Sequence, residues 1–144
     1  MPKLPNKIRT PLTVATLMEK IKTSLLYDLG SAFFAFTLWG GWAYFVNRNS
    51  LSALTQGAAS FIITLFLAHA VTKIYRSLPA KANYILQLFC PAIITVTFTG
   101  ACLYIAHRIT GTAHIEKTIA PALLVALVFC IYTAYRLSRG TRNV

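Results

Sequence analysis

Hydrophobic residues occur in four long blocks that are separated by short polar segments. A helix that rises 1.5 Å per residue needs about 20 apolar residues to cross the roughly 30 Å hydrocarbon core of a bilayer. Each block has about this length. The pattern therefore predicts an all-α membrane protein whose four transmembrane helices cover residues 24–46, 54–75, 84–106 and 118–137.

The connections between the blocks are short, so neighbouring helices should run antiparallel, as two hairpins of one bundle. The whole chain, 1–144, then forms a single domain. Residues 1–9 are polar and predict a flexible tail. Residues 11–23 begin with a Thr10-Pro11 helix-start signal and place apolar side chains near one face. They predict a short amphipathic helix at the membrane interface, or else the first turns of a long first span.

The two predicted hairpins show a weak internal repeat at an offset of 60 residues. At this offset Thr37 aligns with Thr97, Gly40 with Gly100, Tyr44 with Tyr104, Arg48 with Arg108, and Tyr75-Arg76 with Tyr135-Arg136. A parallel duplication explains this register. The alternative is that membrane helices commonly carry tyrosine and arginine at their ends.

Composition agrees with membrane insertion. The chain is 56% hydrophobic and 12% charged, with a mean hydropathy of +0.61, whereas soluble domains carry roughly 25% charged residues. The net charge is +11, from 14 Lys and Arg against 3 acids. These cations flank the apolar blocks instead of forming one stripe. They therefore favour anionic lipid headgroups as partners and argue against nucleic acid.

The basic residues also predict an orientation. One side of the predicted bundle carries Arg48, Arg108 and Lys117, and the other 11 of the 14 cations lie on the opposite side: Lys3, Lys7, Arg9, Lys20, Lys22, Lys73, Arg76, Lys81, Arg136, Arg139 and Arg142. Since cytoplasmic loops are enriched in Lys and Arg, both chain ends should be cytoplasmic. We expect the protein in the inner (plasma) membrane of a bacterium.

A candidate polar site lies in the cytoplasmic third of the predicted bundle. Asp28, His69, Gln87 and Tyr84 fall at similar depths on the first three spans. Polar groups in lipid need partners, so these side chains should face one another. They would either bind a headgroup or relay protons, with Asp28 and His69 as the central pair, or clamp the helices together.

Small residues predict close helix packing. The second span carries Gly57, Ser60 and Thr64 at helical spacing, and Gly40 and Gly100 lie on the first and third spans. Such residues let helix backbones approach closely. The contact could lie within the bundle, in a homo-oligomer, or against a partner membrane protein.

Catalytic, metal and cofactor chemistry is not indicated. The cysteines at 90, 102 and 130 lie inside apolar blocks without CxxC spacing, which favours small buried hydrophobes. His107, His114 and Glu116 lack metal-ligand spacing and predict a solvated outer loop. We expect no cofactor and no metal site, and nothing identifies the chain as an enzyme.

No motif assigns the chain to a family. The first functional hypothesis is a small membrane protein that transports, or assists the transport of, a lipid-like or amphipathic molecule. The alternative is a non-catalytic assembly subunit of a larger membrane complex.

Overall fold

The computed structural model describes residues 14–79 and 82–142, with side chains placed for 22–79 and 82–139. These residues form four helices and no strand: α1 (Val14–Asn47), α2 (Ser50–Ser77), α3 (Tyr84–Ile109) and α4 (Ile115–Arg142). All four are long and apolar enough to cross a membrane. The prediction of an all-α protein with four membrane-span-like helices is therefore confirmed.

Asparagine side chains fix where the second and third helices begin. Asn49 Oδ1 accepts hydrogen bonds from the backbone N–H groups of Leu51 and Ser52. Asn83 Oδ1 accepts one from Ile85 N–H. These caps satisfy backbone donors that a helix leaves free in its first turn. Because Asn49 caps α2, this helix begins at Ser50, one turn before the apolar block at 54.

The first helix is longer than the predicted span. From Val14 to Asn47 the chain is one helix of 34 residues, with no break between the segment predicted at the interface and the segment predicted to span. The start of that interfacial segment, residues 11–13, and the predicted tail lie outside the described residues. From residue 14 on, the structure therefore agrees with the second of the two predictions, in which these residues form the first turns of a long first helix.

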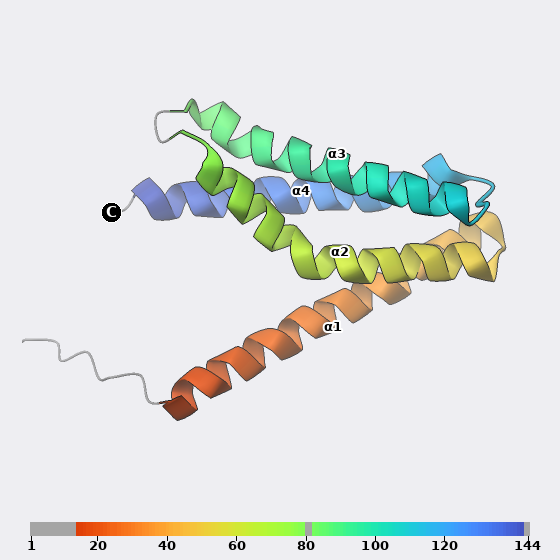
Figure 1. Cartoon of the computed structure of the whole chain (residues 1–144), viewed down its shortest axis with the longest axis horizontal. Helices are drawn as coiled ribbons and strands as arrows, with labels where there is room; N and C mark the ends of the chain where they lie inside the picture. The colour runs from red at the N-terminus through yellow and green to blue at the C-terminus, as the bar shows by residue number, and fades with distance from the viewer. Residues whose placement is uncertain (1–13, 80–81, 143–144) are drawn as a thin grey trace, which may run out of the picture.

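The helices run back and forth along the long axis of the molecule (Figure 1). One end, here called the two-loop end, holds the α1–α2 turn and the α3–α4 loop. The other, the terminal end, holds the α2–α3 connection, Val14 and the C-terminal end of α4. The most extensive contacts are those of α1 with α2 and of α3 with α4, and α2 also touches α3 and α4. The apolar core lies among α2, α3 and α4 and contains Leu67, Val71, Ala92, Cys130 and Ala134.

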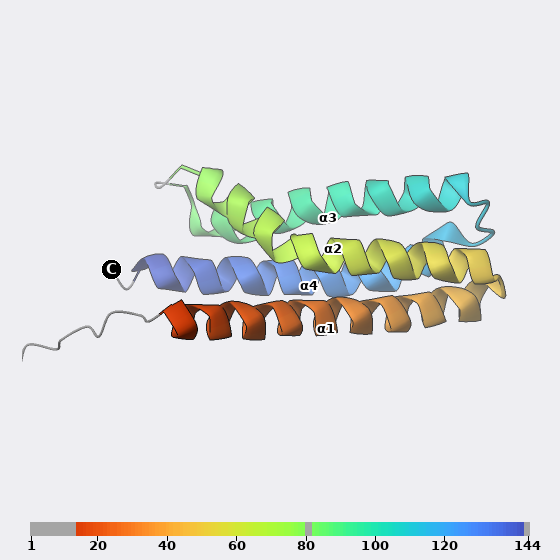
Figure 2. The same ribbon diagram turned by 60° about the horizontal axis from the view of Figure 1, so that its bottom comes forward.

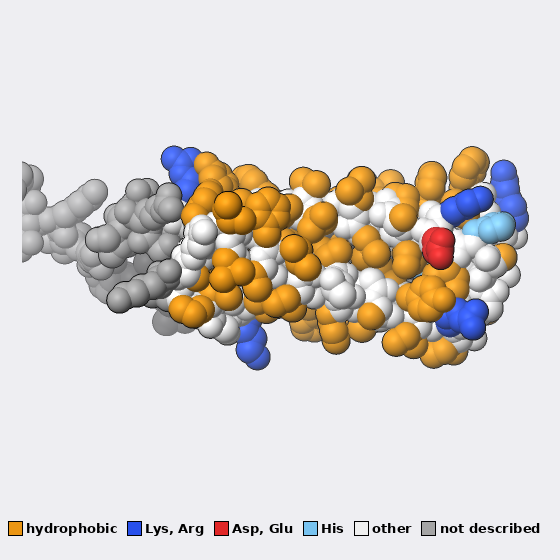
Figure 3. All heavy atoms as spheres, turned by 90° about the horizontal axis from the view of Figure 1, so that it is seen from above, with side chains coloured by type: hydrophobic (Ala, Val, Ile, Leu, Met, Phe, Trp, Pro, Cys, Tyr) orange, Lys and Arg blue, Asp and Glu red, His pale blue; other side chains and the backbone are white. Residues whose placement is uncertain are grey.

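On the face seen in Figure 3, apolar side chains cover most of the length of the bundle, and basic side chains lie nearer its ends. Large exposed hydrophobic residues occur on every helix; examples are Phe33, Phe66, Phe98 and Val128. A contiguous apolar surface of this extent is unfavourable in water and favourable in hydrocarbon. The surface therefore agrees with four helices inside a bilayer.

Glycines set the closest approach between α1 and α2. A Cβ atom built on Gly40 would lie 3.1 Å from the Ala53 carbonyl oxygen, and one built on Gly57 would lie 3.0 Å from the Phe36 carbonyl oxygen. Each glycine therefore meets the backbone of the other helix, as small residues at membrane helix interfaces do. Gly100 instead faces the Leu123 side chain of α4, at 3.1 Å from its built Cβ.

The first half of α1 lies apart from the other helices. In Figure 1, α2 bends partway along its length toward α3 and α4, while α1 diverges toward the terminal end; Figure 2 shows the same bend from another side. Hydroxyl groups of Thr64 and Thr72 on α2 bond back to the carbonyl oxygens four residues earlier, an arrangement that often bends helices. As a result, residues 22–30 of α1 are exposed on every side.

Candidate functional site: a buried polar network beside an apolar cavity

The largest fully buried side chain of the described residues is an imidazole at the two-loop end. His107, in the last turn of α3, is 0% exposed. Its Nε2 lies 2.7 Å from Gln56 Oε1, and its Nδ1 lies 2.8 Å from Thr112 Oγ1. Both ring nitrogens therefore have partners, one from α2 and one from the α3–α4 loop.

The end of α3 places Thr112 within reach of this ring. Gly111 adopts the left-handed backbone conformation (φ +67°), which glycine adopts without steric cost. The Gly111 N–H donates to Arg108 O, and the Thr112 N–H donates to His107 O. This pair of bonds is the Schellman motif that ends many helices. It turns the chain back, so that the Thr112 hydroxyl meets the imidazole five residues earlier.

Three polar residues of α2 complete this cluster, which we call the His107 network: Ser52, Gln56, Ser60, His107 and Thr112. Ser52 Oγ lies 3.0 Å from Thr112 Oγ1, and Gln56 Nε2 donates to Ser60 Oγ over 3.4 Å. Ser52, Gln56 and Ser60 share one helix face because they are four residues apart. In the described part of the chain, every fully enclosed side-chain nitrogen or oxygen atom has a hydrogen-bond partner. The network is therefore complete without a ligand.

The hydrogen-bond roles within the network form one consistent set. With Gln56 Oε1 as acceptor, His107 Nε2–H donates to it. His107 Nδ1 then accepts from the Thr112 hydroxyl, whose oxygen accepts from Ser52 Oγ–H. The Ser60 hydroxyl oxygen accepts from Gln56, which leaves its own proton free to donate elsewhere.

A second set of contacts ties α1 to the beginning of α4 at the same end. Asn47 Nδ2 donates to Thr118 Oγ1 over 2.7 Å, and Asn47 Oδ1 accepts from His114 N–H over 2.9 Å. Trp42 Nε1–H donates to Lys117 O over 3.1 Å. Together with the His107 network, these bonds link all four helices at the two-loop end.

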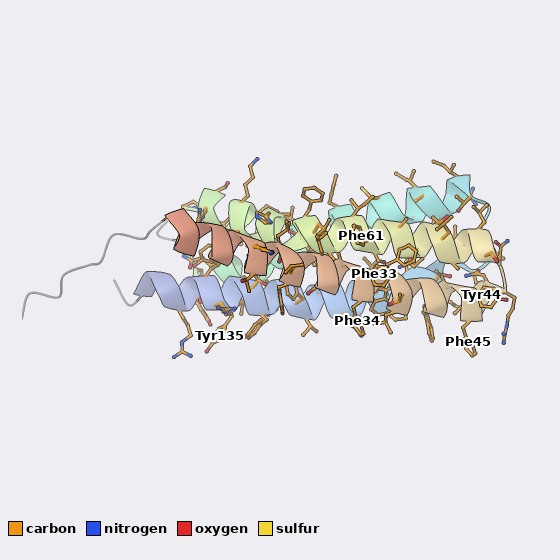
Figure 4. The ribbon with its side chains drawn as sticks, turned by 90° about the horizontal axis from the view of Figure 1, so that it is seen from below. Phe33, Phe34, Tyr44, Phe45, Phe61 and Tyr135 are labelled. Carbon is orange, nitrogen blue, oxygen red and sulfur yellow. The ribbon has the colours of Figure 1, made fainter. Side chains whose placement is uncertain are left out.

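An apolar cavity of about 230 Å³ lies beside the network, nearer the middle of the bundle. All four helices line it, among them Trp39 on α1, Ser60 on α2, Thr99 on α3 and Ala126 on α4. We call it the α1–α4 cavity, because the residues at one edge, Phe34, Leu38, Val125 and Phe129, are exposed on α1 and α4. Phe34 is labelled in Figure 4, where α1 crosses α4.

Three hydroxyl groups line this apolar cavity, and that of Thr64 already donates to the Ser60 carbonyl oxygen. Ser60 Oγ–H has a free proton, as described above, and the Thr99 hydroxyl makes no hydrogen bond with any described residue. Ser60 is 6% exposed and Thr99 is 7% exposed. Ser60 therefore connects the cavity to Gln56 and, through it, to His107.

The structure places the four sequence-predicted site residues near the terminal end without joining Asp28 and His69. Both side chains are exposed, and neither bonds to a described residue. Gln87 accepts from Tyr75 Oη–H over 3.3 Å and donates to Ala82 O over 3.0 Å. Tyr84 is half-buried. Gln87 thus joins the end of α2 to α3.

The remaining residues considered for chemistry separate as well. His114 and Glu116 are exposed, whereas His107 is buried, so these three side chains do not form one metal site. Across the described ranges no group of three metal-ligating side chains occurs. Cys130 is buried, Cys90 is half-buried and Cys102 is exposed, and all three are free.

The two features differ in what they offer to a ligand. The groups of the His107 network are already paired, which favours a fixed shape at the two-loop end. The adjoining cavity offers apolar walls and three hydroxyl groups, the composition expected of a small-molecule site. Comparisons with models of protein families, with curated proteins and with solved structures found no match to this chain.

Proposed function

We propose that the protein binds a lipid-like or amphipathic molecule in the α1–α4 cavity and thereby assists its transport within or across the membrane. The observation that carries this proposal is the cavity itself, which is lined by all four helices and edged by exposed residues of α1 and α4. That edge faces the side of the bundle, where acyl chains would lie in a bilayer. An apolar cavity of roughly 150 Å³ already accommodates a molecule the size of benzene.

Hydroxyl groups support an amphipathic ligand over a purely apolar one. Ser60 and Thr99 can each offer a hydrogen bond inside the cavity. An ester, carbonyl or hydroxyl oxygen next to an apolar chain fits these features.

Quenching of tryptophan fluorescence tests whether the cavity takes up such a molecule. The chain has 2 tryptophans, and Trp39 lines the cavity. In a Trp42→Phe variant, held in detergent micelles, we expect 9,10-dibromostearic acid to quench Trp39 with a saturable dependence on concentration. Ala126→Phe should remove the saturable part, because Ala126 lines the cavity and a phenyl ring would fill it.

Val128→Phe is the matched control, since Val128 is 63% exposed on the same helix and lies outside the cavity lining. It should leave the saturable quenching unchanged, and melting temperatures of all variants report whether they fold. Quenching that rises linearly and equally in both phenylalanine variants would contradict a binding cavity.

We infer that the terminal end faces the cytoplasm of a bacterial inner membrane. Five exposed cations, Lys22, Lys73, Arg76, Arg136 and Arg139, lie toward that end, whereas Arg48, Arg108 and Lys117 lie at the two-loop end. This asymmetry supports the orientation through the positive-inside rule. The finer sequence prediction of a duplicated hairpin remains a hypothesis.

Topology reporters check this orientation. A reporter that is active only in the cytoplasm should be active when fused after Arg139 and inactive when inserted at Asn49, in the two-residue turn between α1 and α2. A reporter that is active only outside should give the reverse pattern. The opposite results at both positions would exclude the proposed orientation.

An assembly subunit is the second candidate function, and one observation favours it. Residues 22–30 of α1 are exposed on every side, including Asp28, which lies four and seven residues before the buried Ala32 and Ala35. Asp28 is therefore on the face that packs inward further along the helix. A partner helix could cover it. In that case, a partner co-purifies through α1 and the Trp39 quenching above shows no saturation.

A further inference from the structure

A second place where a ligand can bind lies on the outer side of α2, at the terminal end. A hollow there is lined by Ala68, His69, Thr72, Lys73, Arg76 and Ser77. His69, Lys73 and Arg76 are exposed and lie four and three residues apart, so they follow one face of the helix. None of the lining residues is acidic, and no described acid forms an ion pair with them.

The hydroxyl groups in this hollow are already engaged, which leaves the nitrogen-bearing side chains as its donors. Thr72 Oγ1 donates to Ala68 O, and Ser77 Oγ donates to Lys73 O. The side chains of His69, Lys73 and Arg76 make no hydrogen bond with a described residue. Three such side chains on one helix face, without partners among the described residues, can donate hydrogen bonds to the oxygens of a phosphate group.

His69 lies too deep along the helix for a purely aqueous anion. It precedes the end of α2 at Ser77 by eight residues, which is about 12 Å at 1.5 Å per residue. An ionisable side chain at such depth on the outer side of a spanning helix requires a polar partner. A phosphate held at the membrane interface by Lys73 and Arg76 supplies one, because lysine and arginine side chains extend along the helix toward the headgroups.

An apolar groove continues from the hollow toward the middle of the membrane. It has a volume of about 410 Å³ and lies between α2 and α3, with Phe66, Ala70, Ile74, Ile94 and Phe98 among its lining residues. Phe66 is three residues before His69, and Ala70 is three residues before Lys73, so groove and hollow adjoin on the surface of α2. One ligand with a phosphate and an acyl chain can occupy both.

We propose that His69, Lys73 and Arg76 form a binding site for the phosphate of an anionic membrane lipid whose acyl chain lies in the α2–α3 groove. The hollow shares no residue with the α1–α4 cavity, whereas the groove shares Ile63, Leu67 and Thr99 with it. The variants that test the phosphate site are therefore placed in the hollow, outside the cavity of the proposed function.

Native mass spectrometry of the full-length protein in detergent tests the site, with phosphatidylglycerol and phosphatidylcholine as probes. The double variant Lys73→Gln/Arg76→Gln should weaken phosphatidylglycerol binding on the order of thirtyfold, since each Lys or Arg near a headgroup contributes about fivefold. His69→Ala should weaken it less, in the same direction. The wild type should retain phosphatidylglycerol in preference to phosphatidylcholine.

The matched control is Arg136→Gln/Arg139→Gln, which removes the same charge from exposed positions of α4 at the same end. It should change phosphatidylglycerol binding less than about threefold. Equal losses in the two double variants, or equal retention of the two lipids, would show general attraction to charge and overturn the site. All these side chains are exposed, so the melting temperature should remain that of the wild type.

Inorganic phosphate distinguishes a lipid site from a site for the free anion. At about 10 mM it should not displace phosphatidylglycerol beyond the effect of chloride at equal ionic strength, because the acyl chain adds affinity that the free anion lacks. Displacement by phosphate alone would overturn the lipid assignment in favour of a soluble phosphate ligand.

Discussion

Replacing His107 by leucine is expected to destabilise the protein by about 2–5 kcal/mol, measured as the free energy of unfolding in mixed micelles. The change removes the partner of Gln56 Oε1 and of Thr112 Oγ1, at 2.7 and 2.8 Å. Gln56 is 0% exposed and cannot turn to water. Its unpaired carbonyl alone costs roughly 1–3 kcal/mol, and the branched leucine side chain, which differs in shape from the planar ring, adds to this by packing less well in its place.

His114→Ala is the matched control. His114 lies at the same end, but its side chain is exposed, and its contact with Asn47 runs through the backbone N–H, which alanine retains. We expect a change within about 0.5 kcal/mol. A His114 variant that is as unstable as the His107 variant would mean that the loop, and not the buried network, responds to the substitution.

A double-mutant cycle separates the hydrogen bond between the two side chains from changes in packing that each substitution makes by itself. Gln56→Leu alone should also destabilise, because it leaves His107 Nε2–H without an acceptor. The double variant His107→Leu/Gln56→Leu replaces both partners with apolar groups, which is far less costly than removing one. We expect the double variant to lose at least about 1 kcal/mol less than the sum of the single losses. Strict additivity would show that the two side chains do not interact.

The number and type of the helices could be predicted from the sequence because membrane insertion imposes a minimum length. Each helix needs an apolar segment that crosses the hydrocarbon, and a segment of that length stands out against the polar turns. The helix ends were harder to predict from the sequence. α2 begins at Ser50 because the Asn49 side chain caps it, and α1 continues back to Val14 although Glu19, Lys20 and Lys22 interrupt the apolar block.

The His107 network was missed for a physical reason that can be traced. The third span was predicted to end at residue 106, which put His107 in solvent, whereas α3 extends to Ile109. Gly111 was the available signal: a glycine just beyond a helix marks its C-terminal cap and places His107 inside the last turn. Ser52, Gln56 and Ser60 also repeat every four residues on α2, a polar stripe that points to one buried face.

The polar residues near the terminal end show that similar depth along neighbouring helices does not determine which side chains meet. Asp28, His69 and Gln87 were grouped because they lie at similar heights along their helices. Their contacts depend on helix rotation and on the bend of α2. Along this helix the Thr64 and Thr72 hydroxyl groups donate to backbone carbonyl oxygens, a local arrangement that composition does not indicate. His69 consequently lies on the outer face with Lys73 and Arg76, a grouping that gives this histidine a different candidate ligand.

The second large destabilisation is expected where α1 packs closely on α2. We expect Gly57→Leu to destabilise the protein by about 3 kcal/mol, because overfilling a packed contact forces the backbone to move. The Gly57 Cβ would already lie 3.0 Å from the Phe36 carbonyl oxygen and 3.1 Å from its ring. Since α2 is the main partner of α1, the leucine should separate the two helices, which a loss of crosslinking between cysteines placed on α1 and α2 would detect.

Gly40 and Gly41 offer an internal control with opposite expected signs. The Gly40 Cβ would lie 3.1 Å from Ala53 O, whereas nothing lies within 4 Å of a Cβ at Gly41. Gly41→Ala should therefore stabilise α1 by up to about 1 kcal/mol through helix propensity alone, and Gly40→Ala should destabilise the protein despite the same gain. If both alanines stabilise, α1 and α2 approach less closely than their glycines require, and the first helix is held mainly by Asn47 and Trp42 at the two-loop end.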